Sequence, residues 1–107
     1  MATTKVFKDI RDGWVAETVI PVKDNQELRL WTSKGYSGQI TTSATIGYRH
    51  DDSSWSTTFG EDFNKRVFAE RERATQKNIT AQHDRALALL PELLAEVARH
   101  YAKKEAA

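Results

Sequence analysis

The chain has 107 residues, with sixteen basic and fifteen acidic side chains and no cysteine. This length fits one domain with a modest core, and the lack of cysteine excludes disulfides, thiolate nucleophiles and cysteine-based metal sites. The formal net charge of +1 means that a positively charged patch of the kind that holds nucleic acid would have to be made by folding.

Two-residue alternation of apolar and polar side chains predicts short strands through the first sixty residues. The pattern is clearest where Ile40, Thr42, Ala44 and Ile46 alternate with polar residues, which indicates one core face and one polar face. The expected strands span residues 5–11, 14–22, 27–34, 39–49 and 55–59. Consecutive strands joined by short turns favour an antiparallel meander.

Residues 61–74 are ambiguous. Phe63 and Val67 are four apart, which suits a helix, yet Asn64 to Ala69 could equally extend the sheet. We expect the end of a strand that leads into a charged connector over 61–74.

The C-terminal part, from about 75 to 103, has apolar residues at spacings of three or four and is predicted to be an amphipathic helix. Pro91 lies in the middle of this stripe, where it predicts a kink or two abutting helices. The stripe comprises Ile79, His83, Ala86, Leu87, Leu90, Leu94, Val97 and Tyr101.

These patterns predict an α+β fold in a single domain over 1–107: a strand-rich part over 5–60, the connector, and the helix packed on one face of an antiparallel sheet of four to five strands. One helix on one small sheet makes a thin core. Part of the stripe is therefore expected to cover either the sheet or a second copy of the chain, in a homodimer. This candidate core or dimer stripe is Leu87, Leu90, Leu94, Val97 and Tyr101.

The sheet face that points away from the helix is the first candidate binding surface. Aromatic rings stack on bases and arginines hold phosphates, so a Trp and two Arg among hydroxyl side chains suit single-stranded nucleic acid. The candidate residues are Arg29, Trp31, Lys34, Tyr36 and Arg49. In the alternative interpretation, Ser and Thr simply fill solvent-facing β positions and Trp31 is covered by the connector or by a partner.

Three other groups have a chemical and a structural interpretation each. Arg71, Arg73 and Lys77 are interleaved with acidic residues, as in a solvated charge run, but would contact phosphate if the glutamates faced elsewhere. His83 on the apolar stripe suits a packed histidine better than a ligand or a base. The His50-Asp51-Asp52 run suits a hairpin turn better than a metal site or a catalytic triad.

No set of residues in the sequence specifies a reaction, a cofactor or a metal. We therefore expect a non-enzymatic binding or assembly module that acts as a homodimer, with single-stranded nucleic-acid binding as the alternative. An enzyme would need a cleft that holds His83 or His50 beside a carboxylate. No apolar run suits a leader or a membrane span, so we expect a cytoplasmic protein with no membrane partner and no small-molecule substrate.

Overall fold

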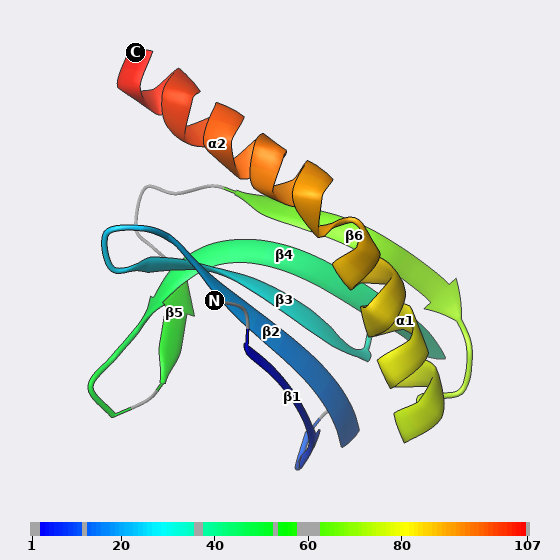
Figure 1. The fold of residues 1–107 in the computed structure, drawn as a ribbon. Helices are drawn as coiled ribbons and strands as arrows, with labels where there is room; N and C mark the ends of the chain where they lie inside the picture. Colours follow the sequence, from blue (N-terminus) through cyan, green and yellow to red (C-terminus); the bar gives the residue numbers. More distant parts are fainter. Residues whose placement is uncertain (1–2, 12, 36–37, 53, 58–62, 107) are drawn as a thin grey trace.

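The structure is a computed structural model that describes residues 3–11, 13–35, 38–52, 54–57 and 63–106. It has the predicted α+β architecture, a curled antiparallel sheet followed by helices that pack on it (Figure 1). The strands are β1 (Thr3–Asp9), β2 (Gly13–Lys23), β3 (Gln26–Lys34), β4 (Gln39–Arg49), β5 (Trp55–Thr57) and β6 (Asn64–Arg71). The helices are α1 (Gln76–Ala88) and α2 (Leu90–Ala106).

The first four strands form the expected meander, and β4 then pairs with two later strands. The short β5 pairs with Gly47 to Arg49, whereas β6 pairs with Gln39 to Thr45 on the same edge of β4. Residues 64–71 thus form the strand that the sequence left open as an alternative to a helix, and the charged connector that follows it is shorter than 61–74. The physical reason is that Val67 and Phe68 pack against the core and the long β4 offers them a free edge.

The C-terminal helix is broken in two, as Pro91 predicts. Leu89 ends α1 with its N–H bonded to the carbonyl of Ala86, and α2 starts at the next residue. Pro91 therefore falls in the first turn of α2, where the missing N–H has no partner to lose. Neither helix is long and apolar enough to cross a membrane, judged over the described residues.

Both helices lie on the same face of the sheet, one after the other (Figure 1). Ile20, Leu28, Leu30, Ala44 and Ile46 are the buried apolar residues that this face of the sheet contributes to the main core. From the helices, the buried members are Ala86, Leu93 and Val97. Leu93, which is outside the predicted stripe, is 2% exposed, whereas Leu94 is half-buried. Val97 is buried as the predicted stripe requires, so the difference is confined to Leu93, which lies deeper than its neighbour Leu94.

Candidate functional site

The outer face of the sheet, away from the helices, holds the residues that the sequence favoured. The guanidinium of Arg29 lies between two indoles, 4.6 Å from the ring centre of Trp31 and 4.0 Å from that of Trp55. The same guanidinium is 3.6 Å from the Glu17 carboxylate. Burial lowers the pKa of Arg29, and Glu17 opposes this shift.

Both arginines of this face lie within ion-pair distance of a glutamate of the same chain. Arg49 is 3.9 Å from a carboxylate oxygen of Glu27, and Trp31 donates its indole N–H to Ser33. Phe7 contacts Trp31 edge-on at 5.8 Å between ring centres. The predicted binding residues Arg29, Trp31 and Arg49 are brought together here, but in a cluster that neutralises and covers itself.

The other two predicted binding residues are elsewhere. Lys34 lies at the far end of β3 and lines a cavity on the opposite side of the sheet. Tyr36 is outside the described residues.

On the inner face, His83 of α1 is 1% exposed and both of its ring nitrogens contact threonines of the sheet. Nε2 lies 2.7 Å from Oγ1 of Thr18, and Nδ1 lies 2.7 Å from Oγ1 of Thr32. The contacts continue on both sides, from Thr18 to Thr4 at 2.8 Å and from Thr32 to Thr42 at 2.7 Å. We call this row, with Gln82 at its end, the polar chain.

Gln82 fixes the direction of the polar chain. Its Nε2 donates to a backbone carbonyl of β4, so its Oε1 accepts from the Thr42 hydroxyl at 2.7 Å. Because a hydroxyl has one proton, Thr42 must accept from Thr32, and Thr32 must accept from Nδ1–H of His83. Nε2 of the neutral ring then accepts from Thr18. All of these bonds are satisfied by one tautomer of an uncharged histidine.

Burial lowers the pKa of His83, and the nearby Asp84 carboxylate opposes this shift only in part. The ring is neutral at physiological pH and too deeply buried to meet a ligand. Its role is structural.

The predicted His50 turn is also explained by local bonding. Asp52 accepts hydrogen bonds from the backbone N–H and the hydroxyl of Ser54, at 3.0 and 2.6 Å. His50 Nε2 lies 2.8 Å from the hydroxyl of Ser56 on β5. These bonds hold the turn between β4 and β5 together, as is usual for Asp and Ser at such positions.

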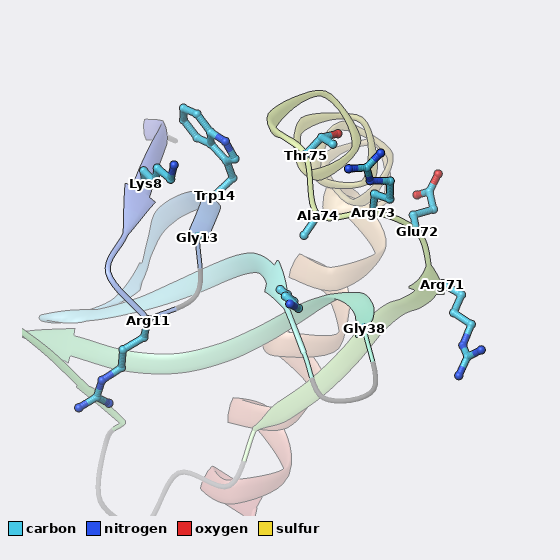
Figure 2. A pocket seen from close by; sticks show the side chains of 11 residues that line it. Lys8, Arg11, Gly13, Trp14, Gly38, Arg71, Glu72, Arg73, Ala74 and Thr75 are labelled. Atoms are coloured by element: carbon cyan, nitrogen blue, oxygen red, sulfur yellow. The ribbon is translucent and has the colours of Figure 1, made fainter.

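An opening lies where the inner face of the sheet extends past the start of α1. It is an open cavity of about 900 Å³ between the β1–β2 hairpin, the end of β3 and the segment that joins β6 to α1. Figure 2 shows Lys8 and Trp14 on the hairpin, facing Arg73, Ala74 and Thr75 across the opening. The side chains of Arg11 and Arg71 point away from the opening and form its outer rim. We call this opening the basic cavity.

The basic cavity has a local excess of positive charge that the net charge of the chain does not reveal. Its lining includes five basic side chains and one acidic side chain, Glu72, although the whole chain has a net charge of only +1. Among the described residues, none of the five forms an ion pair with a carboxylate. The five are Lys8, Arg11, Lys34, Arg71 and Arg73.

The start of α1 adds to this positive potential. Thr75 caps the helix by accepting a hydrogen bond from the N–H of Asn78, and the first turn contains no acidic residue. Such a residue would otherwise offset the positive end of the helix dipole, and Lys77 stands in that turn instead. The dipole therefore reinforces the charge of the side chains at the cavity.

Sequence reasoning identifies only part of this site. Arg71 and Arg73 belong to the cluster that would contact phosphate if its glutamates faced elsewhere, whereas Lys34 is predicted on a different surface and Arg11 on none. Lys8 and Trp14 were missed. Their signal is the hairpin itself, because its pairing places Lys8 directly opposite Trp14.

Much of the candidate core or dimer stripe lies against the chain's own core. Val97 is 3% exposed, and the other four residues are partly buried and pack on the main cluster: Leu87, Leu90, Leu94 and Tyr101.

Comparison with known proteins gives no relative from which a function could be transferred: no family model matches the chain, and no curated protein or solved structure is significantly similar to it.

Proposed function

We propose that this protein is a non-enzymatic binding module that holds nucleic acid by its phosphate backbone at the basic cavity. The observation that carries the proposal is the gathering of five basic side chains around one opening, with no ion pair to a carboxylate among the residues that the structure describes, in a chain of almost no net charge. Positive charge left unpaired on one face is the electrostatic footprint of a nucleic-acid site.

The shape of the basic cavity favours a polymer over a small anion. A pocket for a single phosphate group converges several donors on one point, whereas these cations come from three separate segments around a wide opening. Two of them, Arg11 and Arg71, point outward along the rim (Figure 2). A charged backbone that crosses the opening would meet them in succession.

The outer face of the sheet is a weaker candidate for the same activity. Its two arginines are each within 4.0 Å of a glutamate carboxylate, so binding phosphate there would require breaking those pairs. We therefore move the expected nucleic-acid site from Arg29, Trp31 and Arg49 to the basic cavity.

The proposal is tested by fluorescence anisotropy with a labelled oligonucleotide of mixed sequence over a range of salt concentrations. We expect the double variant Lys8→Gln, Arg73→Gln to bind at least tenfold more weakly at about 50 mM salt, because two phosphate contacts and the counterions they release are lost. The slope of log affinity against log salt should fall by about 1.4 for a single strand.

The matched control is Arg99→Gln, Lys103→Gln, which removes the same charge from exposed positions of α2. We expect it to bind within about threefold of the unmodified protein, since only the long-range field changes. Equal losses in the two double variants, or no binding at all at low salt, would contradict the proposal.

Self-association remains a separate proposal. The thin core suggested it, but much of the stripe meant for a second copy is already covered by the sheet. Light scattering at tens of micromolar decides it, and a strict monomer would contradict the homodimer.

A further inference from the structure

We infer that the basic cavity selects single-stranded nucleic acid, with one base stacked on the indole of Trp14 and the flanking phosphates held by Lys8 and Arg73. This inference rests on the proposed function and names the kind of strand that the site takes.

Trp14 is fixed in place and yet accessible. One part of its side chain packs on the small buried cluster of Ala16, Ile40 and Ile79, which holds the ring to the sheet. The rest lines the basic cavity, and the residue as a whole is half-buried. A ring anchored in this way loses little conformational freedom when a base stacks on it.

The ring of Trp14 is also less occupied than the other two indoles. Its recorded cation contact is with Lys8, whose Nζ is 5.9 Å from the ring centre, a long and easily displaced interaction. Trp31 and Trp55 instead have the same Arg29 guanidinium against their rings at 4.6 and 4.0 Å. A base would have to displace a half-buried, ion-paired arginine to stack on either of them.

The surroundings of Trp14 supply what a single strand needs next to the base. Lys8 lies beside the ring on the hairpin, and Arg73 faces it from the segment before α1 (Figure 2). Aromatic platforms flanked by cations are the usual device for unpaired strands, because every base has a face that can stack. In a duplex those faces are already covered by neighbouring base pairs, so a duplex would meet only the cations.

The test compares a labelled oligothymidylate of about twelve nucleotides with a duplex of the same length, at one low salt concentration. We expect Trp14→Ala to weaken binding of the single strand by about tenfold and binding of the duplex by less than twofold. Trp14→Phe, which keeps a flat ring, should stay within about threefold on both probes. The matched control is Trp31→Phe on the opposite face, which should leave both affinities unchanged.

Thermal melting of each variant shows whether it is folded at the assay temperature. If Trp14→Ala is not, Trp14→Leu replaces it, because leucine keeps the apolar anchor without a stacking face and should give the same tenfold loss. An equal loss on both probes, or no loss on either, would overturn the inference. The proposed function would survive that result if the Lys8→Gln, Arg73→Gln variant still lost binding, whereas a loss confined to Trp31→Phe would return the site to the outer face of the sheet.

Discussion

Thr32→Val is the sharpest test of the polar chain, because valine has nearly the same shape as threonine and removes only the hydroxyl. Thr32 is fully buried; its Oγ1 accepts from Nδ1–H of His83 and donates to Thr42, both at 2.7 Å. The substitution leaves the imidazole N–H without an acceptor in the interior, at about 1 to 3 kcal/mol, and deletes one further hydrogen bond of about 1 kcal/mol. Since removing a buried hydroxyl gives back part of its desolvation, we expect a net loss of about 2 to 3 kcal/mol in the free energy of unfolding.

The assay is urea unfolding followed by circular dichroism, with thermal melting as a second measure, where the midpoint should fall by roughly 10 °C. Thr41→Val is the matched control, because Thr41 is a half-exposed residue on the outer face of the neighbouring strand. We expect the control to change stability by less than about 0.5 kcal/mol. If Thr32→Val were as mild as Thr41→Val, the two buried hydrogen bonds assigned to the Thr32 hydroxyl in the polar chain would be refuted.

Three further predictions concern the core and the sheet. Burial lowers the pKa of His83, so below about pH 6.5 the unfolded chain binds a proton on this residue that the folded chain does not. The free energy of unfolding should therefore fall below that pH by up to about 1.4 kcal/mol per pH unit. His83→Gln should remove this part of the pH dependence, as measured by urea unfolding at several pH values. Gly47→Ala would place a methyl group 2.4 Å from the indole of Trp55 and 2.2 Å from a backbone oxygen of β5. We expect the free energy of unfolding to fall by about 1 to 3 kcal/mol and the near-ultraviolet circular dichroism spectrum to change. A spectrum identical to that of the unmodified protein would contradict this packing. Leu93→Ala should cost about 2 to 4 kcal/mol in chemical unfolding and the half-buried Leu94→Ala clearly less, whereas the reverse order would restore the stripe expected from the sequence.

Hydrophobic rhythm was enough to predict the class of fold. The alternation around Ile40 to Ile46 identified the central strand with its bounds, and Pro91 correctly announced a break in the helix. The hydrophobic pattern left β6 undecided between strand and helix, because Phe63 and Val67 have a helical spacing and the pairing of Asn64 to Arg71 with β4 is a tertiary contact. It also missed Leu93, which is 2% exposed and lies deeper than Leu94, because spacing identifies the apolar side of a helix but not which of two adjacent leucines is more buried.

The candidate site was harder to predict, because a charged surface is assembled from distant segments. Lys8 and Arg73 are sixty-five residues apart, and each has an acidic residue next to it that conceals its charge in the local sequence. The alternation of side chains also favoured Trp31 over Trp14 as a binding residue. Alternation shows which face of a strand a side chain is on, but not whether an arginine covers its ring. Tertiary contacts decide this, and they also decide which cations gather at one opening.

The row of threonine hydroxyls on the inner face has a consequence for how the strands find their alignment. A shift of one strand by two residues along its neighbour returns every apolar side chain to the same face of the sheet. Hydrophobic contacts alone therefore discriminate poorly between registers that differ by two residues. Thr4 stands opposite Thr18 and Thr32 opposite Thr42, with the imidazole of His83 spanning the gap between the two pairs. A shift of this kind would leave these buried hydroxyls and the imidazole without hydrogen-bond partners. The threonine pairs therefore select one register of the sheet.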